Sequence, residues 1–211
     1  MKIGIIGAGN VGTGLAKNLV RKGHQVLFSF AKDRDKLAAT ARSFGGRSGT
    51  VAEAIAFGDV VVLATPWSVT PDALQQAGPT KERKILWDCT NALKPDLSGL
   101  AIGTTTSAGE EVARLAPWAR VVKAIPPFAE LLHSPDVRVA GHPVDIFMCS
   151  DDAEAKAVVR QLLFDLDTAP IDAGPLRNAR YAEPAGFLVV QLAYALGFGT
   201  RLGLSLLHQK I

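Results

Sequence analysis

Cysteine is scarce in this sequence of 211 residues, which contains only Cys89 and Cys149. The two residues lack the paired spacing of zinc ligands, and they are too few for the disulfide framework of a small secreted domain. We therefore expect no metal site and no disulfide, and a reducing cytoplasm as the location of the protein.

Long hydrophobic runs are also missing. The N-terminus has one lysine followed by a short apolar run that glycine interrupts, so we expect no secretory signal peptide. The most apolar region, residues 187–207, contains Gln191, Tyr194, Arg201 and several glycines, which predicts buried helices rather than a membrane span. A membrane is therefore not an expected partner.

Neither sign of charge dominates. The 23 lysine and arginine residues and the 20 aspartate and glutamate residues leave a net charge of +3, and no basic cluster occurs along the chain. Because nucleic-acid binding leaves a basic patch or stripe in a sequence, nucleic acid is not an expected partner either. The composition, 48% hydrophobic and 20% charged, is typical of a globular domain.

Strand and helix signals alternate along the chain. Short apolar or β-branched runs predict strands at residues 2–6, 25–30, 59–64, 84–87, 120–124, 144–149 and 169–172. Amphipathic segments between them predict helices, and this alternation predicts an α/β fold with a doubly wound, mostly parallel sheet. We expect this domain to cover residues 1–174. Residues 175–211 would form a helical segment that packs on the cleft or on a second subunit.

A glycine motif follows the first predicted strand and begins a helix. It reads Gly7-Ala8-Gly9-Asn10-Val11-Gly12. Gly7 permits a tight turn, Gly9 lets a pyrophosphate approach the backbone, and Gly12 lets the helix pack closely on the strand. The free N–H groups at the helix start then favour an anion. The motif predicts a Rossmann fold that binds a nicotinamide dinucleotide; a glycine-rich turn without a ligand is the alternative.

The end of the second predicted strand bears on the choice between NAD and NADP. NAD sites place a carboxylate there, whereas this chain has Ala31, Lys32, Asp33 and Arg34. Lys32 and Arg34 can pair with a 2′-phosphate, which favours NADP(H). Two alternatives stay open: both cations are ordinary surface charges, or Asp33 is the ribose ligand if the strand ends later.

Further motifs carry a resemblance to a known family. They are Gly7–Gly12, Ala-Thr-Pro-Trp at 64–67, Asp-Cys-Thr-Asn at 88–91, Thr-Ser-Ala-Gly-Glu at 106–110, Val-Val-Lys-Ala at 121–124 and Asp-Ala-Gly-Pro-Leu-Arg-Asn-Ala-Arg at 172–180. With these motifs the chain resembles the coenzyme F420-dependent NADP oxidoreductases over nearly its whole length.

The resemblance implies roles for individual residues. Asn10 and Val11 would donate backbone N–H groups to the pyrophosphate, and Lys32 would contact the 2′-phosphate. The other implied cofactor positions are Thr65, Pro66 and Trp67 at the carboxyl edge of the sheet, Asn91 near the nicotinamide ribose, and Ile125, Pro126 and Ala129 at the nicotinamide. For the second substrate the resemblance implies Pro127, Phe128 and Leu202.

The chain departs from the family pattern at two places. The family usually has a His-Thr or Asn-Thr pair where this chain has Pro126-Pro127, and a serine where it has Ala31. The acceptor of the hydride therefore does not follow from the resemblance.

The resemblance favours an oxidoreductase that moves hydride between NADP(H) and a second redox partner, a deazaflavin (F420) or a flavin, and that forms a homodimer. Two alternatives stay open. One is an NADPH-dependent reductase of a small carbonyl or imine compound, and the other is a non-catalytic NADP(H)-binding module that senses redox state.

Hydride transfer to a flavin requires no acid–base residue, so no catalytic residue is assigned. A carbonyl or imine substrate would need a proton donor, for which His133 is the histidine retained. Arg177 and Arg180 would contact an anionic substrate or only neighbouring strand ends.

Overall fold

The computed structural model describes residues 1–78, 83–207 and 209. In this part of the chain eight strands form one sheet in the order β3-β2-β1-β4-β5-β6-β7-β8. The strands are β1 (Lys2–Ile6), β2 (Gln25–Ser29), β3 (Arg47–Ser48), β4 (Val60–Leu63), β5 (Lys84–Asp88), β6 (Ala119–Ala124), β7 (Asp145–Cys149) and β8 (Ala169–Asp172).

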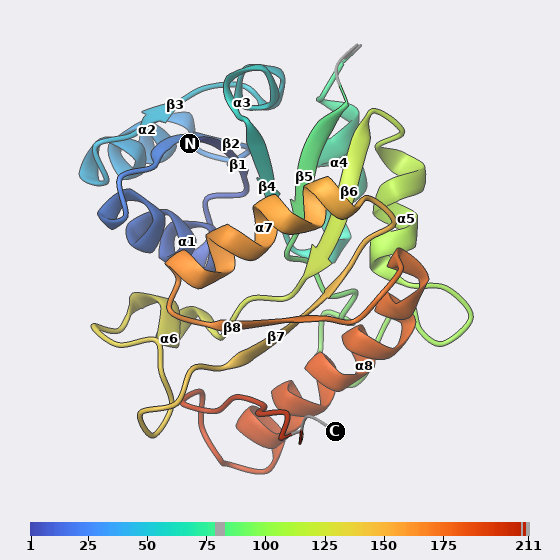
Figure 1. The fold of residues 1–211 in the computed structure, drawn as a ribbon. Coiled ribbons are helices and arrows are strands. Elements are labelled where there is room, and N and C mark those ends of the chain that lie inside the picture. The colour runs from blue at the N-terminus through green and yellow to red at the C-terminus, as the bar shows by residue number, and fades with distance from the viewer. Residues whose placement is uncertain (79–82, 208, 210–211) are drawn as a thin grey trace.

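Helices cover both faces of this sheet (Figure 1). They are α1 (Asn10–Arg21), α2 (Arg34–Ser43), α3 (Val51–Phe57), α4 (Thr70–Gln75), α5 (Ala108–Leu115), α6 (Ala129–His133), α7 (Ala153–Asp165) and α8 (Ala179–Val190). Two 3₁₀ turns, η1 (Trp67–Val69) and η2 (Leu176–Asn178), and a π-helical turn, η3 (Gln191–Ala195), complete the structure. None of the helices in the described ranges is long and apolar enough to cross a membrane.

The strand order confirms the doubly wound fold. Strands β1 to β6 are mutually parallel and follow the order 3-2-1-4-5-6 of Rossmann domains. Strand β7 pairs antiparallel with the end of β6 through Lys123 and Ala124, and β8 then pairs parallel with β7. Figure 1 shows β7 and β8 crossing below the carboxyl ends of β4, β5 and β6.

Burial on both faces explains why the central strands are apolar throughout. In β4, Val60 and Val62 join the core cluster that includes α1 and α7, whereas Val61 and Leu63 join the cluster that includes α3, α4 and α5. Successive side chains of a strand point to opposite faces, so a strand covered on both sides needs an unbroken apolar run.

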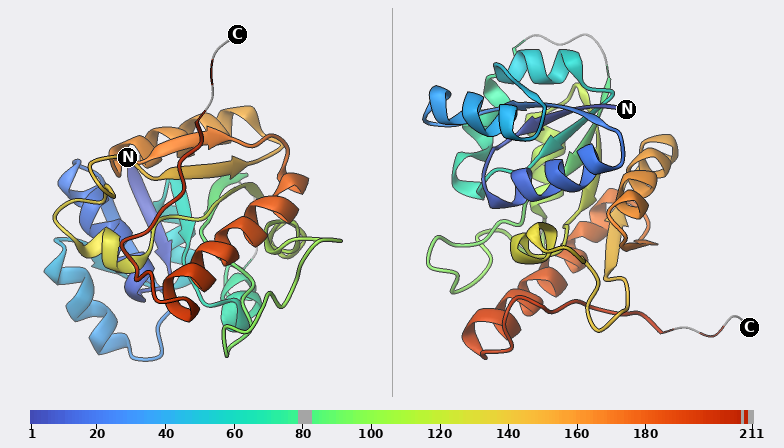
Figure 2. Two further views of the ribbon diagram at one scale, coloured as in Figure 1. Left: turned by 90° about the horizontal axis from the view of Figure 1, so that it is seen from below. Right: turned by 90° about the vertical axis from the view of Figure 1, so that its left-hand side faces the viewer.

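The C-terminal segment lies apart from both core clusters for most of its length. Helix α8 buries only Ala179 and Glu183, and the apolar stripe that begins at Phe187 and Leu188 is half-buried or exposed. The tail then turns back past β7, where the Asp145 N–H donates to the Leu204 carbonyl at 3.0 Å (Figure 2). The prediction of buried helices over residues 187–207 is therefore wrong: the stripe is not core of this chain, and the described residues after η3 form no helix, because the glycines at 197 and 199 take a positive φ and end it. The division at residue 174 stays a prediction.

Two short elements were not predicted from the sequence pattern. Strand β3 has two residues and helix α6 has five. Segments this short do not complete a hydrophobic period, so their formation depends on tertiary packing.

Candidate functional site

The glycine loop joins β1 to α1 at the point where the strand order reverses, between β1 and β4. Gly7 has a φ of +109°, and a Cβ there would lie 2.5 Å from the Ala64 carbonyl oxygen. A Cβ at Gly12 would lie 2.0 Å from the Gly7 carbonyl oxygen, whereas a Cβ at Gly9 would meet nothing within 4 Å. Gly7 and Gly12 are therefore needed for the fold, and Gly9 leaves an open space in front of the helix.

The start of α1 lacks a side-chain cap. Its N-cap residue is Gly9, no side chain accepts a hydrogen bond from the first turn, and no acidic residue lies in that turn. By contrast, α2, α3, α5 and α7 begin with the capping side chains Asp33, Thr50, Ser107 and Asp152. The uncapped N–H groups and the positive end of the helix dipole therefore face the open space at Gly9.

Two cavities flank this helix start. The first, called here the glycine-loop cavity, measures about 1050 Å³ and extends from Gly7 and Gly9 to the ends of β2 and β4. The second, called the apolar cavity, measures about 460 Å³ and begins at Asn10 and Val11. The first turn of α1 thus lies between a cavity with charged side chains on its lining and an apolar one, and both are large enough to hold a ligand, since ligand pockets measure about 300–1,000 Å³.

Cationic side chains line one side of the glycine-loop cavity. The chain leaves β2 through Phe30, whose φ of 59° lies in the left-handed region, and places Lys32, Arg34 and Lys36 along the lining. The Asp33 carboxylate also lies there, but it caps α2 by accepting a 2.9 Å hydrogen bond from the Lys36 N–H. Three cations therefore lie beside the end of β2, together with a carboxylate that the start of α2 engages through one oxygen.

The apolar cavity lies between the β6–α6 connection, α8 and the C-terminal tail. Pro126, Pro127 and Phe128 form one wall, and Leu202 and Leu204 of the tail lie on the lining as well. Prolines and a phenylalanine make this wall stiff and apolar, which suits a site that must exclude water.

Asn91 lines the apolar cavity and carries a buried acceptor without a partner among the described residues. Its Nδ2 donates to the Glu183 carbonyl oxygen at 3.2 Å, while its Oδ1 is buried and has no partner among the described residues. A buried acceptor without a partner costs about 1–3 kcal/mol, so a ligand that donates an O–H or N–H to this atom would be stabilised.

Helix α6 is held against α1, which positions the wall of the apolar cavity. Asn18 Nδ2 donates to the Leu132 carbonyl at 2.7 Å, and Lys17 Nζ donates to the His133 carbonyl at 2.6 Å. A Cβ at Gly14 would lie 2.7 Å from Leu132 Cβ, so the two helices meet at a residue without a side chain. His133 Nε2 lies 2.9 Å from the Asn10 carbonyl oxygen, and His133 is not part of the cavity lining.

A buried ionic cluster joins the sheet, α5 and α8. Lys123 of β6 lies 2.8 Å from Asp88 and 3.2 Å from Glu183, and all three side chains are at most 1% exposed. Glu183 of α8 also accepts hydrogen bonds from the Ala108 and Gly109 N–H groups at the start of α5. Burial alone lowers the pKa of Lys123, but the charges of Asp88 and Glu183 outweigh it and raise its pKa above 10.5.

Sequence reasoning missed the role of Glu183. Asp88 and Lys123 stood in motifs of the resemblance, but a single glutamate within an apolar helix carries no local signal for a partner far away in the sequence. Only the packing of α8 under the sheet brings the three charges together.

All predicted site residues except Gly12 and Trp67 line one of the two cavities. The glycine-loop cavity contains Gly7, Gly9, Ala31, Lys32, Arg34, Thr65 and Pro66. The apolar cavity contains Asn10, Val11, Asn91, Ile125, Pro126, Pro127, Phe128, Ala129 and Leu202. Trp67 instead packs against the core cluster that includes α4 and α5.

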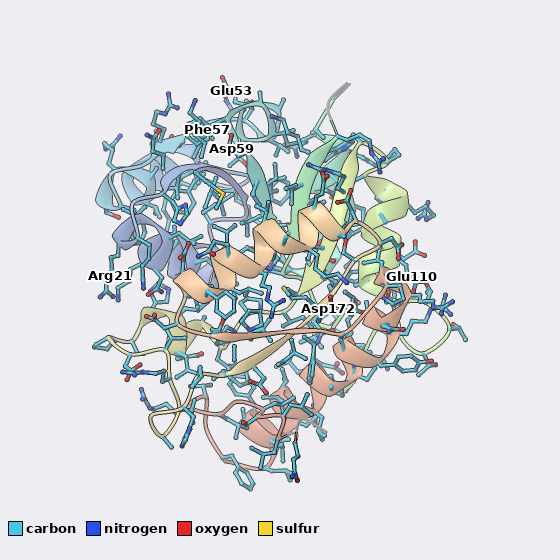
Figure 3. The ribbon with its side chains drawn as sticks, in the orientation of Figure 1. Arg21, Glu53, Phe57, Asp59, Glu110 and Asp172 are labelled. Atoms are coloured by element: carbon cyan, nitrogen blue, oxygen red, sulfur yellow. The ribbon has the colours of Figure 1, made fainter. Side chains whose placement is uncertain are left out.

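The remaining candidates have structural partners or poor reactivity. Arg180 forms a two-pronged ion pair with Glu110, at 2.7 and 2.8 Å, which projects from the start of α5 toward α8 (Figure 3). Tyr181 is 73% exposed and does not line either cavity. Cys89 lines the apolar cavity, but burial raises the pKa of its thiol well above 9.0.

Comparison with known proteins identifies relatives of this chain. A family model described as "NADP oxidoreductase coenzyme F420-dependent" matches residues 2–92. A protein from Arthrobacter sp. FB24, provisionally named an F420-dependent NADP reductase, is 30% identical with a TM-score of 0.86; the match covers 99% of this chain and 100% of that one. A hypothetical protein from Sinorhizobium meliloti is 26% identical with a TM-score of 0.71, over 85% of this chain and 87% of that one.

More distant structures share the fold alone. A reductive aminase from Aspergillus terreus, solved with NADPH4, cyclohexanone and allyl amine, is 19% identical with a TM-score of 0.67. The match covers 92% of this chain but 61% of the aminase.

The Rossmann sheet and its open helix start define a protein of the dinucleotide-binding class. The match to the Arthrobacter protein extends over essentially all of both chains. The chain belongs to the family of coenzyme F420-dependent NADP oxidoreductases, and it is an NADP-dependent oxidoreductase.

Proposed function

We propose that the protein transfers hydride from NADPH, bound across the start of α1, to an acceptor held in the apolar cavity. One observation carries this proposal: the uncapped start of α1 lies between a cavity with a cationic side and a cavity with an apolar wall. NADPH has three parts in the same order: a phosphorylated adenosine half for the cationic cavity, a central pyrophosphate for the helix start, and a reactive nicotinamide ring for the apolar cavity.

Individual residues would hold the cofactor as follows. The backbone N–H groups of Asn10 and Val11 bind the pyrophosphate, and Lys32 and Arg34 pair with the 2′-phosphate. Asn91 accepts a hydrogen bond from the nicotinamide ribose through its unpaired Oδ1. The segment Ile125–Ala129 lies at the nicotinamide.

NADPH supplies the hydride, so the protein has to orient two rings and exclude water. Pro126, Pro127 and Phe128 hold a rigid surface because α6, which follows them, is bonded to α1. That rigidity fixes the distance between the pyrophosphate site and the nicotinamide site, on which hydride transfer depends. No side chain has to donate a proton if the acceptor is a deazaflavin or a flavin, which the family resemblance favours.

One observation favours a second candidate, the reduction of a small carbonyl or imine compound. Tyr194 of the π-helical turn lines the apolar cavity and packs edge-on against Phe128, with 5.8 Å between ring centroids. Its hydroxyl could donate the proton that such a substrate needs. Tyr194→Phe should then lower kcat for carbonyl or imine acceptors and leave flavin reduction unchanged.

Stopped-flow oxidation of NADPH tests the proposal. The protein is mixed with NADPH and with F420, FMN, riboflavin or a panel of ketones and imines, and absorbance at the nicotinamide band is followed. Rapid oxidation with one class identifies the acceptor. Tight NADPH binding without oxidation by any acceptor would overturn the enzymatic proposal in favour of a non-catalytic redox-sensing module.

Charge reversal tests the 2′-phosphate contact. Lys32→Glu should weaken NADPH binding at least tenfold more than NADH binding, because only NADPH carries the 2′-phosphate. Arg21→Glu is the matched control, because Arg21 lies at the far end of α1 from the glycine loop (Figure 3). Equal losses for both cofactors would contradict the assignment of Lys32.

The proposal includes a homodimer in the cytoplasm. Large apolar side chains of α8, η3 and the following turn are exposed, among them Leu188, Leu196 and Phe198. Exposed apolar groups that gather on one element indicate an interaction surface, and a second copy of the chain would cover it. Sedimentation velocity measures the oligomeric state.

A further inference from the structure

His133 is a histidine that the proposed function does not use. It is exposed at the end of α6 and lines neither cavity. Its imidazole nevertheless reaches the start of α1, where Nε2 lies 2.9 Å from the Asn10 carbonyl oxygen and 3.3 Å from Thr13 Oγ1. A side chain from a distant helix therefore contacts the backbone of the glycine loop.

The neighbours of Nε2 decide where the imidazole proton lies. A carbonyl oxygen can only accept, so the 2.9 Å contact with Asn10 requires a proton on Nε2. The Thr13 hydroxyl does not compete for this role, because its single proton is donated to the Gly9 carbonyl oxygen at 2.9 Å. We therefore assign the proton to Nε2, which donates to the Asn10 carbonyl.

The Asn10 carbonyl and the Val11 N–H belong to the same peptide group. A trans peptide group is planar, so its C=O and N–H bonds point in opposite directions. A hydrogen bond that holds the Asn10 oxygen therefore fixes the direction of the Val11 N–H, which points toward the open start of the helix. This N–H is one of the two that are proposed to bind the pyrophosphate.

The second of these N–H groups is held from within α1. The Asn10 N–H shares its peptide group with the Gly9 carbonyl, which accepts from the Thr13 N–H and from the Thr13 hydroxyl, each at 2.9 Å. Each peptide group is thus held through its oxygen by a side chain, one from the same helix and one from α6. A hydrogen bond to the C=O also polarises a peptide group and makes its N–H a stronger donor.

The packing of α6 on α1 sets the position of the imidazole. Lys17 and Asn18 of α1 donate to the last carbonyls of α6. A Cβ at Gly14 would lie 3.3 Å from His133 Nε2, so the missing side chain makes room for the ring. Because α6 directly follows residues 126–128, one short helix connects the wall of the apolar cavity with the glycine loop.

We propose that His133 is a positioning residue for cofactor binding, whose Nε2–H holds the Asn10–Val11 peptide group so that the Val11 N–H points at the pyrophosphate of NADPH. This inference rests on the proposed function, in which the start of α1 binds the pyrophosphate. His133 then does not supply a proton to the hydride acceptor, because the nitrogen that carries its proton is engaged outside the apolar cavity.

Calorimetric titration of three ligands tests the proposal. NADPH carries every part of the cofactor, 2′-phospho-ADP-ribose lacks the nicotinamide ring, and adenosine 2′-phosphate lacks the pyrophosphate as well. His133→Ala should weaken the binding of the first two about three- to tenfold, which is the usual range for the loss of one hydrogen bond. The affinity for adenosine 2′-phosphate should stay within about twofold of the wild-type value, because this ligand does not reach the Val11 N–H.

Two further variants make the result specific. In His133→Gln the amide nitrogen can take the place of Nε2 and donate to the Asn10 carbonyl, so NADPH affinity should return to within about twofold of wild type. His142→Ala is the matched control, because His142 is also exposed and lines neither cavity. Since both histidines are exposed, the Tm of all three variants should stay within about 3 °C of wild type.

The protein without ligand provides a second readout. In ¹H–¹⁵N spectra the Val11 amide signal should shift in His133→Ala and return toward its wild-type position in His133→Gln, because the bond to the Asn10 oxygen polarises this peptide group. An unchanged Val11 signal in His133→Ala would overturn the inference, since the imidazole would then not hold the peptide group.

The binding results separate this inference from the proposed function. A wild-type protein that does not bind NADPH would overturn both. Unchanged NADPH affinity in His133→Ala would overturn the inference alone, and a lower kcat with imine or carbonyl acceptors at that unchanged affinity would identify His133 as a proton donor instead. A loss confined to NADPH, or an equal loss for all three ligands, would also overturn it, because His133 would then act on the nicotinamide wall or on the fold as a whole.

Discussion

Glu183→Gln is the substitution that most directly tests how the C-terminal helix is attached to the sheet. The Glu183 carboxylate accepts from the Ala108 N–H at 2.8 Å and the Gly109 N–H at 2.9 Å, and it lies 3.2 Å from Lys123. Glutamine has the same shape but loses the charge and one acceptor oxygen. Its amide NH₂ would face either a backbone N–H or the ammonium, which are both donors.

The expected cost follows from the burial of this cluster. Removing one partner of a buried ion pair costs about 3–5 kcal/mol. Because Lys123 retains Asp88 at 2.8 Å, we expect a value near the lower end, about 3 kcal/mol. For a chain of this length, 1 kcal/mol shifts the Tm by about 2–4 °C, so the Tm should fall by about 6–12 °C.

Thermal unfolding followed by circular dichroism measures this shift. Glu154→Gln is the matched control, because the Glu154 side chain is 91% exposed in α7 and its substitution should cost less than about 0.5 kcal/mol. Lys123→Met should cost more than Glu183→Gln, since it leaves two buried carboxylates without a cation.

If Glu183→Gln changed the Tm no more than Glu154→Gln does, the reasoning would be refuted, because Glu183 would then not stabilise the fold. The same variant should also raise the KM of the acceptor more than the Kd of NADPH. Helix α8 lines the apolar cavity through Gly186 and Val189 but does not line the glycine-loop cavity.

Three further predictions follow from the geometry. Gly9→Ala should change the Tm by no more than about 1 °C, because its Cβ meets nothing within 4 Å, but it should weaken NADPH binding at least tenfold in calorimetry. Gly12→Ala should instead destabilise the fold, because its Cβ would lie 2.0 Å from a backbone oxygen. The pKa of Lys123 is higher in the folded state than its unfolded value of about 10.4. Its contribution to stability is therefore complete below the unfolded pKa and is lost as the pH rises through the folded pKa. The Tm of the wild-type protein should then fall more at strongly alkaline pH than the Tm of Lys123→Met. Because burial raises the pKa of Cys89, iodoacetamide at pH 8 should not modify it in the native protein but should do so in urea, as mass spectrometry would show.

Local patterns were sufficient to predict most of the fold. The predicted strands agree with the observed ones to within a residue or so at each end, and the Thr50–Glu53 capping box is confirmed. Helix caps, glycine turns and apolar runs are local features, and each residue's conformation there depends on neighbours a few positions away. The short elements β3 and α6, which depend on contacts with distant segments, could not be predicted in this way.

The sequence predicted which residues the candidate site contains, but not how they are arranged in space. Gly9 and Lys32 were predicted as cofactor residues because a tight turn favours glycine and a phosphate favours a cation, and both line the glycine-loop cavity. The part that Asp33 plays in the start of α2, which its carboxylate caps, became visible only in the structure. Tyr194 was named only as a polar interruption of an apolar region, because its approach to Phe128 depends on how α8 crosses the sheet.

The sequence by itself determined that this chain folds as a doubly wound sheet and presents an open helix start to a dinucleotide, since strand periodicity and the backbone freedom of Gly7 are encoded locally. The tertiary structure alone decided which charges are available in the apolar cavity. Lys123 is a cation in the sequence, yet Asp88 and Glu183, which approach it from another strand and a distant helix, remove its charge from the cavity. Electrostatic pairing depends on distance in space, and for residues so far apart in the chain only the folded packing sets that distance.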